Sequence, residues 1–331
     1  MGPELGAGST TQFNKNDNLL SVQSLGFFIM GAAFFASTPA LKAAPFFPPR
    51  LDGAGGCGIL LVGEGGDYGW VEAADVIRRS AGAAYPVEVA AGPGDQAGLR
   101  LALERLENRH VSRAALLPLY LFPSSPFLNQ TLDAVGLGAV KTTTPPTFVS
   151  RTGTVIPRLP VRLDPPVVSS SVRLLRTAPL GESPFFPRLI ASRARAVSKS
   201  PRHTVLFLVG NVSIMETSSA KAWETWAQNV ALQAGISGGF KRARAFSLRE
   251  DGPDAERVKH EQVLTAAALK ALSSGHLAVV PLEPRPGLAE SGAHNALRGL
   301  LVDFASKPLL PDPILGQWAL AAAEKACGEA R

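Results

Sequence analysis

The sequence predicts an α/β protein with two similar domains, each a small parallel sheet with helices on both faces. Short apolar runs that end in glycine are typical of strands buried on both faces, and GILLVGEG (58–65) is the first of them. Such runs alternate with amphipathic segments of helical period, which indicates βαβ units and parallel strands. The same order of segments then occurs a second time, as expected after duplication of a domain.

The first domain is predicted over residues 55–140. A strand, a helix, a strand, a helix and a strand are predicted in turn at 58–65, 70–84, 86–92, 98–110 and 114–122. Residues 141–172 are rich in Pro, Thr and Ser, and this composition predicts an extended linker between the two domains.

The second domain is predicted over residues 173–310, followed by a C-terminal helix or tail at 311–331. Helices are predicted at 183–199, 220–235 and 255–275, and strands at 204–213 and 276–284. Aligning LLVGEGG with FLVGNVS pairs Glu64 with Asn211. Aligning LLPLYL with VVPLEP pairs Pro118 with Pro281. These landmarks indicate that the second domain is a copy of the first.

Residues 1–44 predict a signal peptide or an N-terminal anchor. Leu19–Ala36 is a run of 18 residues in which only two serines and one glutamine are polar. The small residues that follow suit a signal peptidase, so we expect export with cleavage. The alternative is an uncleaved anchor, because a run of this length barely spans a bilayer. In either case the body of the protein is expected outside the cytoplasm, periplasmic or anchored facing the periplasm.

Composition restricts the classes of partner and site. Hydrophobic residues make up 46% and charged residues 18%, which argues against extended disorder. The net charge of +6 fits an anionic ligand or surface, but no nucleic-acid-binding motif accompanies it, so no nucleic acid partner is expected. The five histidines lack metal-ligand spacing, and Cys57 and Cys327 form no CxxC motif. A disulfide between these two cysteines is left open by the sequence.

Four segments, taken in their order and spacing, resemble the class II sirohydrochlorin chelatase family. GILLVGEGG resembles the family's strand that ends in Gly-His-Gly-Ser, and the stretch from PVEVAAG to LLPLYL resembles its next strand, acidic turn, helix and strand. FPSSPFLNQT resembles a Ser-Ser-His-Ser segment, and LLRTAPLGESPFFPRLIASRA resembles the linker into a second chelatase domain. The resemblance covers residues 57–305. It implies two chelatase-type domains that face each other across a cleft holding the macrocycle.

The resemblance implies insertion of a divalent metal (Co, Ni or Fe) into a tetrapyrrole such as sirohydrochlorin. The metal is a substrate, and no tightly bound cofactor is expected. In this family histidine imidazoles bind the metal and accept the pyrrole protons. None of the matching positions in this chain is a histidine. These positions are Glu64, Ser124 or Pro126, Asn211, and a site near Gly287 or Ala289.

Glu64 is the candidate catalytic residue and metal ligand, because a carboxylate at a strand tip can bind a divalent ion and act as a base. Its alternative role is to accept turn N–H groups at the start of a helix. Asp95 is the second candidate metal ligand, with an ordinary helix N-cap as the favoured alternative. Ser124 and Ser125 are candidate substrate-binding residues, with capping of the next helix as the favoured alternative.

Three functions follow from the sequence. The first is a chelatase, a lyase-type enzyme. The second is a non-catalytic tetrapyrrole- or metal-binding protein, a carrier or sensor. The third is a structural or interaction protein that retains only the fold, which a cleft filled by Tyr120, Phe122 and Phe127 would favour. A basic cluster before the second domain suits a carboxylate-rich macrocycle, although a solvated helix face is the favoured interpretation. Its members are Arg188, Arg193, Arg195, Lys199 and Arg202.

Overall fold

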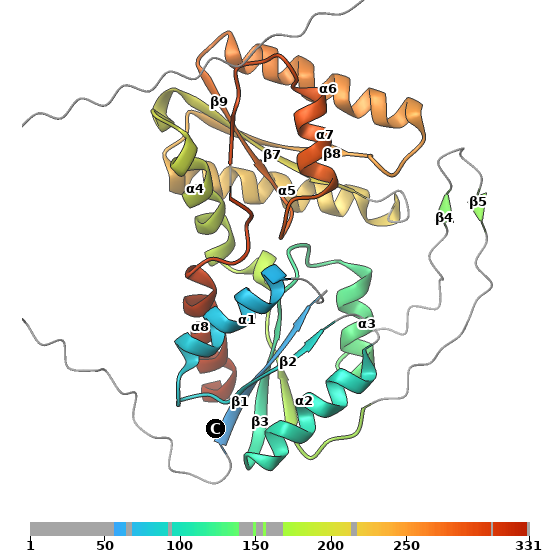
Figure 1. Ribbon diagram of the computed structural model, residues 1–331, viewed down its shortest axis with the longest axis vertical. Coiled ribbons are helices and arrows are strands. Elements are labelled where there is room, and N and C mark those ends of the chain that lie inside the picture. The colour runs from blue at the N-terminus through green and yellow to red at the C-terminus, as the bar shows by residue number, and fades with distance from the viewer. Residues whose placement is uncertain are drawn as a thin grey trace, which may run out of the picture. The chain divides into compact units, whose positions relative to one another are not determined.

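The computed structural model describes residues 56–63, 68–91, 95–138, 148–149, 155–156, 168–212, 217–305 and 307–329. They form two four-stranded parallel sheets with helices on both faces, which confirms the predicted fold class (Figure 1). The predicted signal peptide or anchor lies outside the described residues. Within the part that is described, no helix combines the length and the apolar character needed to span a membrane.

The first sheet has the strand order β2-β1-β3-β6. Its strands are β1 (Gly56–Gly63), β2 (Val87–Ala91), β3 (Val111–Pro118) and β6 (Arg173–Arg176), and its following helices are α1 (Tyr68–Ala81), α2 (Gln96–Asn108) and α3 (Pro126–Ala134). Because side chains alternate along a strand, β1 supplies two separate cores. Ile59 and Leu61 pack on the side of α1, whereas Leu60 and Val62 pack on the side of α2 and α3.

The second sheet has the order β10-β9-β7-β8. Its strands are β7 (Thr204–Asn211), β8 (Arg242–Leu248), β9 (His276–Pro281) and β10 (Asp303–Phe304). Its helices are α4 (Phe185–Val197), α5 (Thr217–Gly238), α6 (Asp254–Leu272) and α7 (Leu288–Ala296), with single 3-10 turns η1 (Leu180–Glu182) and η2 (Pro201–His203). Helices α4 and α5 cover one face, and α6 and α7 cover the other.

The two sheets are copies of one another in topology and register. In each, a central strand is flanked by the next strand on one side and the third strand on the other. Val62 pairs with Pro118 in the first sheet, and Val209 pairs with Pro281 in the second. Superposing these pairs aligns Gly63 with Gly210, which is the register predicted from the sequence, and Glu64 itself lies outside the described residues.

Each sheet carries a short fourth strand that the sequence did not predict. β10 extends the second sheet beside β9. β6 pairs with β3 through Arg173↔Arg113, so it belongs to the first sheet. The predicted start of the second domain at residue 173 therefore falls inside a strand of the first sheet. The pattern RLLR has neither a buried run nor a clean alternation, which is why it gave no strand signal.

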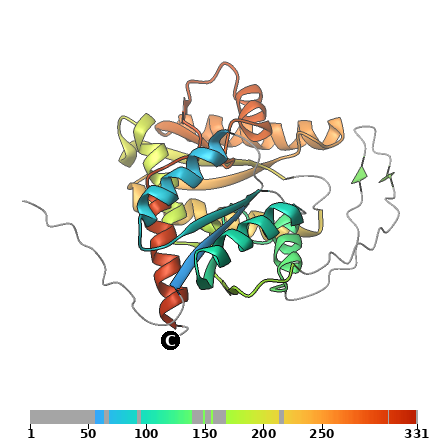
Figure 2. The ribbon, with the colours of Figure 1, turned by 60° about the horizontal axis from the view of Figure 1, so that its bottom comes forward.

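The C-terminal helix α8 (Ile314–Glu329) returns to the first half of the chain. It packs against α1, β1 and β3, and lies beside α1 and β1 in both views (Figures 1 and 2). A disulfide joins Cys57 at the start of β1 to Cys327 near the end of α8. Residues predicted as a C-terminal helix or tail are thus a helix that completes the core of the first half, with Trp318 only 2% exposed.

The predicted linker at 141–172 contains one regular feature among its described residues. β4 (Phe148–Val149) and β5 (Val155–Ile156) pair antiparallel as a two-stranded ladder. β4 and β5 therefore run in opposite directions within a segment predicted to be extended.

Candidate functional site

The carboxyl ends of parallel strands are where open α/β sheets gather their ligands. In the first sheet this edge follows Gly63, Ala91 and Pro118. Only glycine fits at position 63, because a Cβ there would collide with the indole of Trp70 and approach the carbonyl of Leu119. Glu64 is the next residue in the sequence. Residues 64–67 lie outside the described part, so the role of Glu64 stays a prediction.

Asp95 acts as a helix cap. It is the N-cap residue of α2, and its Oδ1 accepts the N–H of Gly98 at 2.8 Å. This is the favoured alternative from the sequence, and it satisfies one of the first-turn donors that a helix leaves unpaired. Within the described parts of the chain no group of His, Cys, Asp or Glu side chains that could hold a metal ion includes Asp95, so its role as a metal ligand stays a prediction.

Ser124 and Ser125 precede α3 at the same edge. Ser124 is exposed, and Ser125 is buried at the N-cap position. The expected side-chain cap is absent from Ser125, whose carbonyl instead accepts the N–H of Asn129 at 3.2 Å. Proline at the first helical position has no N–H to satisfy, which lowers the need for a cap. Contact of either serine with a substrate stays a prediction.

The three aromatic residues after β3 lie in different surroundings and do not together fill a cleft. The Tyr120 side chain is buried and its hydroxyl lies 3.1 Å from Thr131 Oγ1 of α3. Phe122 packs on Trp226 of α5 with ring centroids 5.6 Å apart, and Phe127 is 44% exposed. Since Trp226 Nε1 also donates to Gly181 O at 3.0 Å, this side chain connects α5 to the segment between the sheets.

The equivalent edge of the second sheet has polar residues that satisfy backbone groups. Asn211 Oδ1 accepts the N–H of Glu250 at 3.0 Å and so joins the ends of β7 and β8. Glu283, two residues past β9, accepts the N–H groups of Ala289 at 2.6 Å and Glu290 at 3.3 Å. The site predicted near Gly287 or Ala289 is therefore the N-terminus of α7, occupied by the protein's own carboxylate.

Two carboxyl groups at this edge have shifted acidity. Burial raises the pKa of Glu283, against the opposing effect of the backbone N–H groups it accepts. Burial and the charge of Glu261 raise the pKa of Glu250. Gly292 of α7 lies directly against the Glu250 carboxyl, where a Cβ would collide with it. Both groups hold a proton more readily than an exposed glutamate does.

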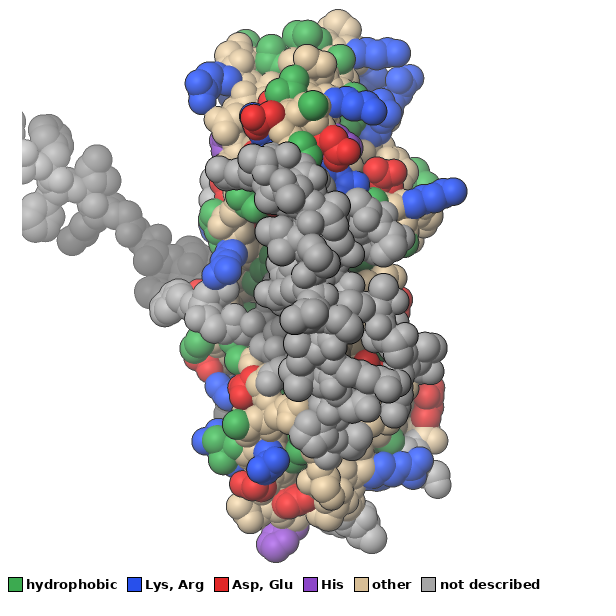
Figure 3. All heavy atoms as spheres, turned by 90° about the vertical axis from the view of Figure 1, so that its right-hand side faces the viewer, with side chains coloured by type: hydrophobic (Ala, Val, Ile, Leu, Met, Phe, Trp, Pro, Cys, Tyr) green, Lys and Arg blue, Asp and Glu red, His purple; other side chains and the backbone are tan. Residues whose placement is uncertain are grey.

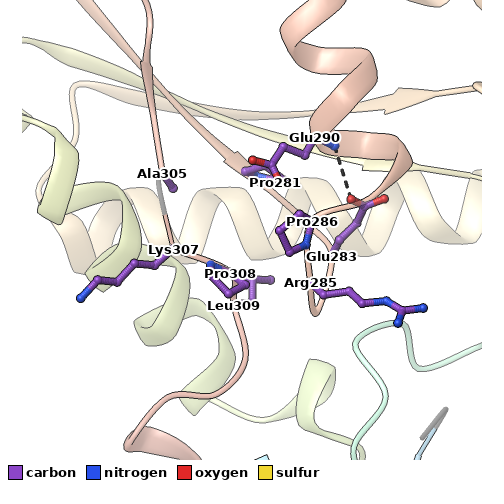
Figure 4. A pocket seen from close by; sticks show the side chains of 9 residues that line it. All are labelled: Pro281, Glu283, Arg285, Pro286, Glu290, Ala305, Lys307, Pro308 and Leu309. Atoms are coloured by element: carbon purple, nitrogen blue, oxygen red, sulfur yellow. Dashed lines mark hydrogen bonds between the residues drawn. The ribbon is translucent and has the colours of Figure 1, made fainter. Parts of the chain in front are cut away.

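A shallow pocket opens beside Glu283, with Glu290 and Arg285 among its lining residues (Figure 4). The charges of its lining are mixed in sign, and prolines at 281, 286 and 308 form much of its wall. In Figure 4, the side chains of Arg285 and Lys307 point away from Glu283. The pocket has no convergent set of ligands for a metal.

Two of the five histidines make packing or backbone contacts. His260 Nδ1 lies 2.9 Å from Ser247 O, and His294 stacks on Phe304 with ring centroids 3.8 Å apart. His110 follows α2 in the left-handed conformation, with φ 57°. Among the described residues, which include all five histidines, no three His, Cys, Asp or Glu side chains gather in a way that could hold a metal ion.

The duplicated sheets, with helices on both faces and matching carboxyl edges, define a chelatase-like fold. Among solved structures, the chain is similar to SirB from Bacillus subtilis with Fe³⁺, with a TM-score of 0.54, 15% identity, and coverage of 83% of this chain and 97% of that one. It is also similar to DR2241 from Deinococcus radiodurans, a multi-domain protein described as structurally similar to chelatases, with a TM-score of 0.51 and 19% identity. That match covers 82% of this chain and 55% of DR2241, so this chain spans about half of its length.

A second SirB structure, described as a sirohydrochlorin chelatase in complex with cobalt, matches at a TM-score of 0.49 and 12% identity. At that score it adds nothing to the assignment of the fold. No protein-family model matches the sequence, and neither does any curated protein. At these identities the likeness shows the fold alone.

Proposed function

We propose that this protein is a chelatase of the sirohydrochlorin type, which binds a carboxylated tetrapyrrole and inserts a divalent metal. The observation that carries the proposal is the chelatase-like fold over 83% of the chain, with SirB as one of the similar structures. The four segments that resemble the class II family support it, since they occur in the family's order. Co, Ni and Fe are the candidate substrate metals.

Metal insertion replaces two pyrrole N–H protons by one divalent ion, so the site must bind the ion and accept two protons. We assign metal binding and the acceptance of one proton to Glu64, which directly follows the central strand of the first sheet in the sequence, and the second proton passes to solvent water. A carboxylate can bind a first-row divalent ion and act as a general base when its pKa is raised by burial. Asp95 is the second candidate ligand, and Ser124 and Ser125 are candidates for hydrogen bonds to substrate carboxylates.

The test is a spectrophotometric titration with sirohydrochlorin, followed by addition of Co²⁺ or Ni²⁺. We expect metallation above the uncatalysed rate and its loss in Glu64→Gln. The matched control is Glu104→Gln, which makes the same change at an exposed position of α2 and should leave the rate unchanged. Equal rates for wild type and Glu64→Gln would remove Glu64 from the mechanism.

A non-catalytic tetrapyrrole-binding protein is the second candidate. It is favoured by the way Asp95, Asn211 and Glu283 use oxygen atoms to accept backbone N–H groups. A shift of the macrocycle spectrum without faster metallation would support this function. If the macrocycle spectrum does not change at all, the protein has kept the chelatase-like fold without either of these functions.

We further propose that the body of the protein lies outside the cytoplasm. The apolar run at 19–36 supports export, and the Cys57–Cys327 disulfide supports an oxidising compartment, because glutathione keeps cytosolic thiols reduced. Labelling of free thiols in freshly isolated protein should find none before reduction and two after it. Two free thiols before reduction would place the protein in a reducing compartment.

A further inference from the structure

The loops at the amino edge of the second sheet form one basic surface. This edge lies at the opposite ends of the strands from the candidate site. The backbone N–H of Lys241 donates to Pro201 O at 3.2 Å and to Thr204 O at 3.0 Å, and its Nζ donates to Ser274 O at 2.8 Å. The loops that precede β7, β8 and β9 are therefore in direct contact.

Cations dominate these loops and the last turns of the helices that lead into them. The stretches 188–204, 239–245 and 270–276 contain no Asp or Glu. We define the amino-edge patch by six exposed cations. They are Arg195, Lys199, Arg202, Lys241, Arg242 and Lys270. Asp303, at the start of β10 on the far side of β9, bounds the patch.

Part of this charge has a structural explanation. α4 and α6 end at this edge, and cations near helix C-termini interact favourably with the helix dipole. Arg195 and Lys270 lie in such last turns, and Lys241 is bound to a loop carbonyl. Lys199, Arg202 and Arg242 do not lie in the last turn of an α-helix, so the helix dipole does not account for them.

Large apolar side chains are exposed at the same edge. α5 and α6 run from the carboxyl edge of the sheet back to the amino edge, so their last turns lie beside the basic loops. Ile236 on α5 is 74% exposed and Leu269 on α6 is 54% exposed. Leu301, just before β10, is 92% exposed. A cationic surface with protruding apolar side chains combines the two terms that hold proteins on anionic bilayers.

We propose that the amino-edge patch binds the surface of an anionic phospholipid bilayer. The exposed apolar residues favour a bilayer over nucleic acid or free phosphate, neither of which offers an apolar layer. On the described parts of the face shown in Figure 3, by contrast, acidic and basic side chains are intermingled. With the amino edge on the membrane, the carboxyl edge of the same sheet faces away from it. The proposal does not depend on tetrapyrrole chemistry.

The test is flotation of the full chain with vesicles of phosphatidylcholine, with and without phosphatidylglycerol. The patch variant is Lys199→Gln/Arg202→Gln/Arg242→Gln/Lys270→Gln. The control variant removes four exposed cations elsewhere: Arg79→Gln/Arg100→Gln/Lys259→Gln/Lys325→Gln. Both variants have the same net charge and the same residues 1–47, so binding through the N-terminal segment or by overall charge affects them equally.

A basic side chain near an anionic surface strengthens partitioning onto the membrane about fivefold. Because the patch variant lacks four such side chains, it should bind phosphatidylglycerol vesicles at least about 50-fold more weakly than the control variant. Phosphatidylglycerol should strengthen binding of the wild type, and this gain should weaken with salt. Equal loss in the two variants, or binding that is indifferent to phosphatidylglycerol, would overturn the proposal. Circular dichroism and thermal unfolding establish that both variants are folded.

A second pair of variants separates a bilayer from other polyanions. Ile236→Ser/Leu269→Ser should weaken vesicle binding, whereas Leu101→Ser, at a residue of the first half that is 47% exposed, should not. A DNA duplex serves as the competing polyanion. If the patch variant loses binding to DNA while vesicle binding is unchanged, the surface is a nucleic-acid site and the proposal is wrong.

Discussion

At the scale of single residues, polar side chains at the two carboxyl edges accept hydrogen bonds from the protein's own backbone. Asp95 caps α2, Glu283 caps α7, and Asn211 joins two strand ends. The sequence predicts the first of these, because Asp before an amphipathic stripe is an ordinary N-cap. Glu283 was missed as a cap because it lies six residues before Ala289, whose N–H it accepts, so it lacks the usual spacing of a capping residue.

Glu283 makes the stability of the protein depend on pH. Because burial raises its pKa, the folded protein holds this proton to a higher pH than the unfolded chain does. The stability it contributes is present below the unfolded pKa and is lost as pH rises through the raised folded pKa. Glu283→Gln removes this titration and can still accept the N–H of Ala289.

We therefore expect the free energy of unfolding of Glu283→Gln, relative to wild type, to increase between pH 4 and pH 7. Urea unfolding at a series of pH values measures it. Glu104→Gln, the same change at an exposed position of α2, is the control. A difference for Glu283→Gln that varies with pH no more than that for Glu104→Gln would contradict the raised pKa.

At the scale of elements, the repeat extends to how each central strand meets its helix. Gly63 ends β1 against Trp70 of α1, and Gly210 lies near the end of β7 against Trp223 of α5. In both places a Cβ would collide with the indole ring. The sequence shows the two glycines and the two tryptophans, but only the folded chain shows that each pair is in contact.

We predict that Gly63→Ala and Gly210→Ala each destabilise the protein by about 1–3 kcal/mol, the usual cost of overpacking a core. Gly328→Ala is the control, because a Cβ there meets nothing within 4 Å and alanine is the better helix former. Chemical unfolding of the three variants compares them. The interpretation fails if Gly210→Ala is as stable as Gly328→Ala.

At the scale of the whole molecule, the chain closes on itself. α8 returns to α1, and Arg193 of α4 bonds to the segment before α8, with its Nη2 3.0 Å from Pro311 O and 3.1 Å from Asp312 Oδ2. The Cys57–Cys327 disulfide joins residues 270 positions apart. The last turns of α8 are thereby held on the first strand.

Removing the disulfide should be costly, because a cross-link that closes a long loop restricts the unfolded chain most. We expect Cys57→Ser/Cys327→Ser to lose about 3–5 kcal/mol of unfolding free energy. A reductant should destabilise the wild type by a similar amount and leave the double variant unchanged. Equal stability of the oxidised and reduced wild type would show that the bond contributes nothing.

The sequence by itself determined the fold class, the duplication, and the alignment of Glu64 with Asn211. These follow from local signals, namely buried runs ending in glycine and amphipathic helices. The tertiary structure alone decided that β6 joins the first sheet, that α8 covers the first half, and that the two cysteines pair. These depend on contacts between residues distant in sequence, whose free energy comes from surfaces buried only once the chain has folded.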